Sequence, residues 1–397
     1  MRNDTVEIRN PANGFPSNIQ VERIPVGLPY DYKPNLAILP DGELLLTAFR
    51  SNCFWVRKGV RENILLFRSA DGGRTWSDPD ILGVSRNLPG REPYLTVLNS
   101  GVIFLTCSFL KDEERNFRKY PTNFIHRSAD KGKTWTTMEV TSPRTPEGTR
   151  FETTRNILEL PDGTLLFIIT SCNPLGDFIL KSTDSGVTWH DAGEITIENV
   201  PESHPYGVFA EAQMLQLTSG RMLLIARVDH RCYPMPERVL SEEEMIVVNQ
   251  LLATCNVAPI ASIAESGYDE FEHMIFFTSD DGGTIWKQGA NIGDYGMMYP
   301  SVLRLGGGRV LFTFTVRHIN PPLGVRAVLG SETPAGLQID FGHNMFMLDT
   351  ATPFEQSQGG GFGNTVRLPG GGLATAYSYR DENGDIHMEI VRWNLPG

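Results

Sequence analysis

Basic side chains recur near the ends of predicted strands, where several of them could meet around one ligand. These residues are Lys33, Arg50, Arg91, Arg227, Arg317 and Arg326. Because a guanidinium group holds a carboxylate through two parallel hydrogen bonds, a convergent set of arginines predicts a site for an acidic group. Single members of this set could instead pair with carboxylates of neighbouring strands.

Carboxylates and phenols near the same strand ends are candidates for proton transfer and nucleophilic attack. Glu92, Glu152 and Glu211 are candidate acids or bases, because a carboxyl group can exchange a proton with a reacting oxygen. Tyr379 is a candidate nucleophile, and Tyr299 is a candidate substrate contact.

Two histidines accompany the arginines of this set. His230 follows Arg227 by three residues, and His318 comes directly after Arg317. An arginine can neutralise a carboxylate while a histidine removes the proton beside it, which is the chemistry of an elimination. His230 is therefore a candidate catalytic base and His318 a candidate substrate contact, with a plain surface position as the alternative for each.

The elements that must position these residues are indicated by an eight-residue pattern that occurs four times. Its copies are Ser69-Ala-Asp71-Gly-Gly73-Arg-Thr75-Trp76 and residues 128–135, 182–189 and 279–286. The serine and aspartate can bind the backbone of a hairpin turn, the glycine can take a positive φ, and the tryptophan can pack beneath. We therefore predict a structural role for Asp71 and its equivalents, and no catalytic one.

A second repeat joins a leucine, a turn with glycine and an apolar run, and it occurs six times. Its copies begin at Leu39, Leu98, Leu160, Leu217, Leu305 and Leu368. Six such hairpins, each followed by a second hairpin, predict an all-β six-bladed β-propeller of four-stranded antiparallel blades. One domain would span residues 1–397, with a strand around 18–26 closing the ring beside a last strand at 386–393.

The spacing of the turn pattern predicts an insertion in the fourth blade. The serines at 69, 128, 182 and 279 are 59, 54 and 97 residues apart, so about 40 residues are added, at about 232–270. Ser241 and the three glutamates that follow predict an N-capped helix over 241–252. This insertion could cover the site as a lid or join subunits of a homo-oligomer.

The blade geometry also predicts which face carries the chemistry. In an up-and-down blade the first strand starts, and the second strand ends, on the face opposite the hairpin turns. The charged candidates lie at those starts and ends, so we expect the site on the face opposite the four turns.

Composition limits the partners that this chain could have. A net charge of −12 argues against nucleic acid, which needs a concentrated basic surface. No apolar run approaches ~18 residues and residues 1–10 lack an apolar core, so we expect no membrane span and a cytoplasmic protein, or a secreted one whose signal peptide was removed. Five scattered cysteines lack metal-site spacing, so we expect neither a metal nor another cofactor.

The repeated turns resemble those of the sialidase superfamily, whose propellers carry Asp-box (BNR) repeats. The resemblance implies that Glu211 and Arg227 match a family glutamate and arginine, and that Arg326 or Arg317 matches a further arginine. Three positions depart from the family: Lys33 stands near its first arginine, Phe362 replaces its nucleophilic tyrosine, and Glu62 is the one acid between Arg50 and the first turn.

Three functions remain open on these residues. The first is an exo-acting glycoside hydrolase on an acidic sugar held by the arginines. The second is a polysaccharide lyase, or another histidine-dependent enzyme that cleaves glycans. The third is a propeller that binds glycans without catalysis.

Overall fold

The computed structural model describes most of the chain. It leaves out residues 1–3, 51–62, 83–89, 110–121, 141–150, 154, 173–174, 198–209, 229, 231–232, 234, 236–237, 255–256, 266–270, 318, 354–359 and 397, and the side chains of 108–109, 122, 151–153, 170–172, 175–177, 197, 210, 254 and 264. The described residues form five β-sheets and one α-helix, so the prediction of an all-β fold is confirmed.

Three of the sheets contain four antiparallel strands each. The first is β4 (Asp31–Ile38), β5 (Leu44–Arg50), β6 (Ile64–Ser69) and β7 (Asp80–Ile81). The second is β8 (Gly90–Val97), β9 (Ile103–Phe109), β10 (Thr122–Ser128) and β11 (Thr136–Glu139). The third is β26 (Gly361–Arg367), β27 (Leu373–Arg380), β28 (Ile386–Trp393) and β3 (Glu22–Val26).

A nine-stranded sheet combines two sets of antiparallel strands. One set is β12 (Phe151–Thr153), β13 (Leu158–Glu159), β14 (Leu165–Cys172), β15 (Leu175–Ser182) and β16 (His190–Ile197). The other is β17 (Ala210–Gln216), β18 (Met222–Val228), β19 (His273–Ser279) and β20 (Ile285–Ile292). The sets are joined by a short parallel pairing in which Thr196 and Ile197 face Ile285 and Trp286.

The fifth sheet has seven strands. It contains β21 (Met297–Gly306), β22 (Arg309–Val316), β23 (Gly324–Thr333), β24 (Gly336–Ile339), β25 (Met345–Met347), β1 (Thr5–Arg9) and β2 (Ser17–Gln20). This sheet and the nine-stranded one therefore differ from the predicted isolated four-stranded blades. The predicted closing strand also divides, because residues 22–26 pair with β28 whereas residues 17–20 pair with β1.

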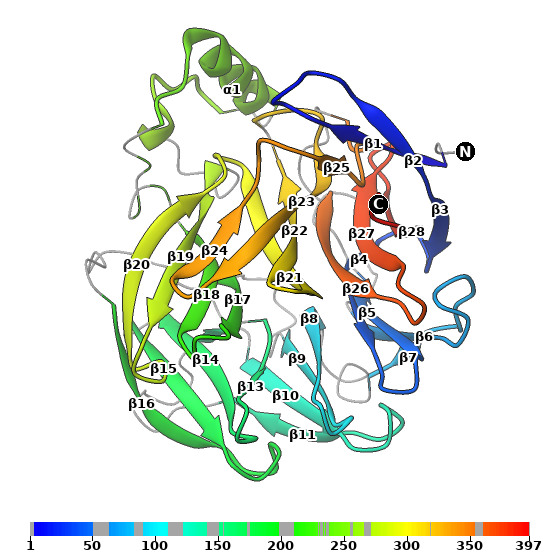
Figure 1. Ribbon diagram of the computed structural model, residues 1–397, viewed down its shortest axis with the longest axis vertical. Helices are drawn as coiled ribbons and strands as arrows, with labels where there is room; N and C mark the ends of the chain where they lie inside the picture. The colour runs from blue at the N-terminus through cyan, green and yellow to red at the C-terminus, as the bar shows by residue number, and fades with distance from the viewer. Residues whose placement is uncertain are drawn as a thin grey trace.

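The sheets lie around a common centre, with one edge strand of each set nearest to it (Figure 1). We call β4, β8, β12, β17, β21 and β26 the inner strands. Side chains in or beside them bind the backbone of the next set at 2.7 to 3.1 Å, and the six bonds join Asn364 to Leu36, Asn35 to Leu95, Thr96 to Ile157, Asn156 to Met214, Gln213 to Val302 and Thr315 to Phe362. These hydrogen bonds form a closed circuit around the centre.

Apolar side chains fill the spaces between neighbouring sheets, which explains why many strands are apolar on both faces. Strand β5 is buried along both faces except at Arg50. Leu44 and Leu46 of β5 belong to one cluster with Ala374 of β27 and Ile390 of β28. Because each sheet is covered by its neighbours, these strands read as continuous apolar runs rather than as alternating ones.

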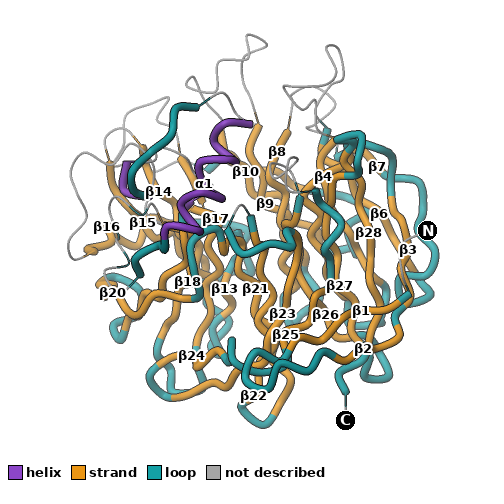
Figure 2. The backbone as a smooth tube through the Cα atoms, turned by 90° about the horizontal axis from the view of Figure 1, so that it is seen from above, coloured by secondary structure: helices purple, strands orange, loops and turns teal. Residues whose placement is uncertain are grey.

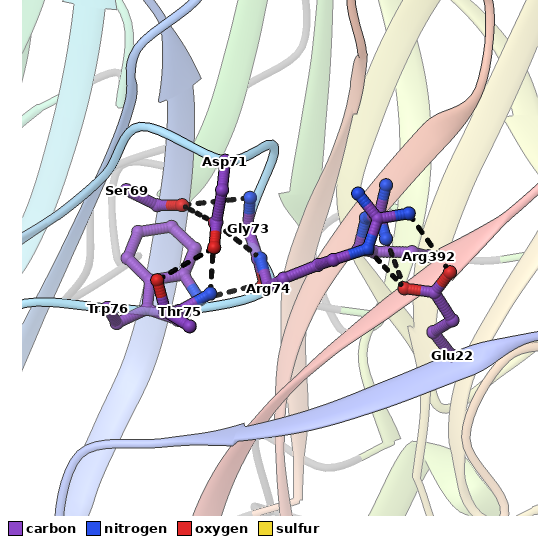
Figure 3. Close-up of polar contacts among 8 residues, drawn as sticks. All are labelled: Glu22, Ser69, Asp71, Gly73, Arg74, Thr75, Trp76 and Arg392. Carbon is purple, nitrogen blue, oxygen red and sulfur yellow. Dashed lines mark hydrogen bonds and ion pairs between the residues drawn. The ribbon is translucent and has the colours of Figure 1, made fainter.

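The four repeated turns share hydrogen bonds of their serine and aspartate, which Figure 3 shows for the first turn. Ser69 Oγ accepts from Gly73 N at 2.9 Å and donates to Asp71 Oδ1 at 2.8 Å. Asp71 also accepts from the backbone and hydroxyl of Thr75 at 2.9 and 2.7 Å, and Trp76 Nε1 donates to Gly73 O at 3.1 Å. The aspartates at 130, 184 and 281 likewise accept from the backbone N–H four residues later, and those at 130 and 184 also accept from a threonine hydroxyl, which isoleucine replaces in the fourth turn. The predicted structural role of these aspartates is confirmed.

The insertion contains the predicted helix, α1 (Glu242–Thr254), and a 3-10 turn, η2 (Ile263–Glu265). Ser241 Oγ accepts from Glu244 N at 3.2 Å, and Glu244 Oε2 accepts from Ser241 N at 2.7 Å, which forms a capping box. Val248 and Leu251 of the helix pack on Phe271 in an apolar cluster of their own. Figure 2 shows α1 on one face and the C-terminus toward the other. Among the described residues, no helix is long and apolar enough to span a membrane.

Candidate functional site

Five of the six inner strands carry the same backbone irregularity. In each, two consecutive residues face a single residue of the neighbouring strand, which forms a β-bulge. The first residue of each bulge has a positive φ although it is not glycine: Lys33 (50°), Glu92 (53°), Glu211 (46°), Tyr299 (57°) and Phe362 (57°). Such residues are uncommon, carry local strain and concentrate at functional sites, because a bulge redirects a side chain. The five bulges lie near the strand starts, at the ends opposite the hairpin turns.

Lys33 joins two of the other bulge residues. Its Nζ lies 2.7 Å from Glu92 Oε2 and 2.8 Å from Glu211 Oε1. Only 10% of the Lys33 side chain and 14% of the Glu211 side chain are exposed, whereas 43% of the Glu92 side chain is exposed. Burial alone would lower the pKa of Lys33, but the carboxylates of Glu211 and Glu92 outweigh burial and raise it. Lys33 is therefore a permanent cation at the centre of the ring.

Glu211 continues this network outward to the next strand. Its Oε2 lies 3.3 Å from Arg227 Nη1, and Arg227 Nε lies 2.7 Å from Glu272 Oε2. Burial alone would raise the pKa of Glu211, but Arg227 and Lys33 outweigh burial and hold that pKa well below its ordinary value. Glu211 therefore stays ionised, and it can stabilise positive charge but cannot act as a proton donor near neutral pH.

Aromatic rings form an apolar base beside these charges. The Phe362 ring contacts two cations, with Lys33 Nζ at 4.1 Å and Arg317 Cζ at 4.2 Å from its centroid. The rings of Tyr299 and Tyr32 meet Phe362 edge to face at 5.0 and 5.5 Å. Arg317 also donates to the Tyr32 hydroxyl at 3.3 Å. We call Lys33, Glu92, Glu211, Arg227, Arg317, Tyr299 and Phe362 the central cluster.

Arg155 reaches this cluster although it was not among the predicted site residues. Its guanidinium Cζ lies 3.9 Å from the centroid of the Tyr299 ring, and its Nη2 donates to Pro300 O. Its backbone N–H donates to Ala212 O at 3.0 Å, beside Glu211. No repeat or motif marks Arg155 in the sequence, so its position follows only from the closure of the ring.

Three predicted basic residues have contacts of their own outside the central cluster. Arg50 forms an ion pair with the buried Asp31 at 2.8 Å. Arg91 lies over the Phe49 ring, with its Cζ 5.9 Å from the centroid. Arg326 is buried and donates to the carbonyls of Asn320 and Pro322, so its guanidinium fixes the loop before β23.

The remaining predicted residues have other neighbours or lie outside the described residues. Tyr379 stacks on His387 with ring centroids 5.4 Å apart, on the same side of β27 as the buried Tyr377. His230 is buried and meets the Tyr295 ring edge to face at 6.3 Å. His318 lies outside the described residues, as does the side chain of Glu152.

A separate cavity of about 510 Å³ lies on the opposite face, beside the first repeated turn. Its charged lining residues are engaged with one another or with neighbours: Arg74 and Arg392 bind Glu22, and Asp71 binds its own turn (Figure 3). The positive-φ bulges lie at the central cluster and not at this cavity, so the central cluster is the candidate site. Among the described residues, no group of three histidine, cysteine or acidic side chains is arranged to hold a metal ion.

Comparison with known proteins agrees with this architecture. The model of the BNR repeat-like domain matches residues 32–310. The chain belongs to this family. This match supports the predicted membership of the sialidase superfamily. A curated sialidase of Micromonospora viridifaciens is 26% identical over 225 residues, which are 51% of this chain and 33% of that protein. The match thus spans about a third of the length of that relative.

Solved structures with the same fold include both characterised and uncharacterised proteins. A protein of unknown function from Dyadobacter fermentans has a TM-score of 0.67 and 17% identity, with 94% of this chain and 98% of that chain covered. The Hadza microbial sialidase Hz136 has a TM-score of 0.61 and 16% identity, with 92% and 65% covered. A leech intramolecular trans-sialidase has a TM-score of 0.60 and 15% identity, with 92% and 68% covered.

Proposed function

We propose that the protein is a glycoside hydrolase that cleaves an acidic sugar from a glycan at the central cluster. The observation that carries this proposal is the contact of Lys33 with Glu92 and Glu211, because it gathers a cation and two carboxylates at the centre of the ring. The family membership and the sialidases among the similar structures support a glycan as the substrate.

The proposed fold is a six-bladed propeller whose repeated turns are Asp-boxes. The nine-stranded sheet divides into two blades at the short pairing of β16 with β20. The sheet of β21 to β25 then supplies another blade, onto which the N-terminal β1 and β2 are added. The closed circuit of hydrogen bonds between inner strands supports this division.

The roles within the cluster follow from exposure and charge. Glu92 is the candidate general acid or base, because 43% of its side chain is exposed while it touches Lys33. Glu211 stabilises positive charge that develops on the sugar ring. Arg317 is the candidate anchor for the substrate carboxylate, because it lies over Phe362 in the cluster while Arg326 binds loop carbonyls.

A glycan-binding protein without catalysis is the second candidate function. Phe362 favours it, because a phenyl ring occupies the position where the resemblance implies a nucleophilic tyrosine, and a phenyl ring has no oxygen to attack the sugar. A polysaccharide lyase, the further alternative, would use His230, whose ring meets Tyr295 edge to face.

The proposal is tested by incubating the protein with sialosides and with uronate-containing oligosaccharides and identifying the products by mass spectrometry and ultraviolet absorbance. We expect release of a free acidic sugar, and a loss of about 100-fold or more in kcat for Glu92→Gln. Glu43→Gln is the matched control, because Glu43 is a part-buried carboxylate on the turn face that pairs with Arg68.

Each other result has a definite meaning. An unsaturated product absorbing in the ultraviolet would replace hydrolysis by elimination. Binding of acidic sugars without any product would establish the non-catalytic function.

A further inference from the structure

Tyr299 occupies a position in the central cluster that a substrate contact alone does not explain. It lies at the bulge of β21, as Lys33 and Glu92 do on their strands, and only 3% of it is exposed. Among the described residues, no hydrogen bond within the protein engages its hydroxyl. A hydroxyl without an internal partner at such a site is available to a ligand.

Two cations flank the Tyr299 ring. Arg155 Cζ lies 3.9 Å and Lys33 Nζ lies 6.0 Å from the ring centroid. A phenol that releases its proton becomes an anion, and an anion at this position is stabilised by both cations. Burial raises the pKa of Tyr299 to about 12 although Arg155 and Lys33 oppose burial, so the phenol carries its proton at neutral pH.

We propose that Tyr299 donates the proton that the leaving glycosidic oxygen needs, and that Arg155 is the positioning residue for this phenol. The inference rests on the proposed hydrolase function and deepens it. Arg155 acts on Tyr299 in two ways, because it covers the ring and binds the carbonyl of Pro300, the next residue of β21.

The reaction balances without a cofactor. The bond between the anomeric carbon and the leaving oxygen breaks, and that oxygen takes the proton of the Tyr299 hydroxyl. A water oxygen bonds to the anomeric carbon, one water proton remains on the new hydroxyl, and the other passes through Glu92 to the phenolate. Tyr299 is then the acid and Glu92 the base.

When a proton donor is removed, kcat falls more for a leaving group that must be protonated than for one that leaves as a stable anion. We would measure kcat and KM with the methyl and the 4-nitrophenyl glycosides of N-acetylneuraminic acid and of glucuronic acid. A methoxide must be protonated as it leaves, whereas 4-nitrophenolate leaves as a stable anion. For Tyr299→Phe we expect kcat to fall at least about 100-fold with the methyl glycoside and less than about 10-fold with the nitrophenyl glycoside.

Matched variants distinguish the loss of the proton donor from a change in packing. Tyr94→Phe removes a hydroxyl from the other ring that Arg155 contacts, with Cζ at 5.4 Å, and it should leave both rates unchanged. Arg155→Met should show the same leaving-group dependence as Tyr299→Phe, with partial recovery in Arg155→Lys, because a lysine retains the charge.

Equal losses of Tyr299→Phe on both glycosides, or no loss, would overturn the inference while the hydrolase function stands. A wild-type protein that turns over neither glycoside would instead refute the hydrolase function and this role of Tyr299 with it.

Discussion

At the scale of the residue, the central cluster is a set of charges that hold one another in place. Lys33 is surrounded by Glu92, Glu211 and two aromatic rings, and only 8% of it is exposed. A buried ion pair stabilises a fold little compared with apolar packing, yet removal of one partner leaves an unpaired charge. The arrangement is therefore better explained by its chemistry than by its contribution to stability.

The charge balance of Lys33 predicts a large effect of its removal. Lys33→Met should lower the free energy of unfolding by about 3 kcal/mol, because Glu211 then loses one of the two cations that form ion pairs with it. The matched control is Lys131→Met on the turn face, where Lys131 pairs with Asp41 and both are exposed, so no measurable change is expected. Urea denaturation of both variants makes the comparison, and equal stabilities would contradict it.

At the scale of the element, the hairpin turns were predictable from the sequence because their residues act locally. The serine, aspartate and glycine of each turn bind backbone within a few residues, so a short motif specifies them. The bulges were not predictable, because Lys33 and Glu92 are residue types that rarely adopt a positive φ. Their conformation depends on the packing of whole sheets around the centre.

The same difference explains which of the predicted site residues the structure brings into contact. Glu211 and Arg227 could be proposed from strand ends and from a family resemblance, and the structure joins them. Arg326 donates to the loop carbonyls of Asn320 and Pro322. Tyr379 faces His387 because of its position in the pairing of β27 with β28. Arg155 reaches Tyr299 only once the ring has closed, since 144 residues separate them in sequence (299 minus 155).

The glycine of the third repeated turn provides a test of packing between sheets. A Cβ on Gly186, whose φ is 76°, would lie 2.2 Å from Phe104 Cζ, whereas a Cβ on Gly163, with φ 83°, meets no atom within 4 Å. Both alanine variants share the strain of a positive φ. We expect Gly186→Ala to be less stable than Gly163→Ala by about 1–3 kcal/mol, measured by thermal unfolding. Indistinguishable melting temperatures would contradict this packing.

The turn aspartates predict how stability depends on pH. Hydrogen bonds from the Thr188 hydroxyl and backbone lower the pKa of Asp184 from its ordinary 3.8 to about 2. A carboxylate with a lowered pKa in the folded state stabilises the protein above about pH 4, and this stability is lost as the pH falls toward 2. Asp184→Asn should therefore melt lower than the wild type at pH 5 and approach it near pH 2. A difference that stays constant from pH 5 to pH 2 would contradict this role.

At the scale of the whole molecule, a chain with a net charge of −12 concentrates cations at the centre of its ring. The inner strands are joined in a circuit of hydrogen bonds, and the bulges near their starts present Lys33, Tyr299 and Phe362 to the same space. An overall negative protein discourages acidic ligands elsewhere on its surface, so binding of an acidic sugar should depend on the central cluster.

Calorimetric titration with N-acetylneuraminic acid, glucuronic acid and glucose tests this claim most directly. We predict that at least one acidic sugar binds more tightly than glucose. Its Kd should rise about 10- to 100-fold in Arg317→Met, because a charged hydrogen bond to the sugar carboxylate is lost. Arg221→Met, which removes an arginine paired with Asp280 on the turn face, should leave the Kd unchanged. Equal binding of acidic and neutral sugars, or an unchanged Kd in Arg317→Met, would contradict the account.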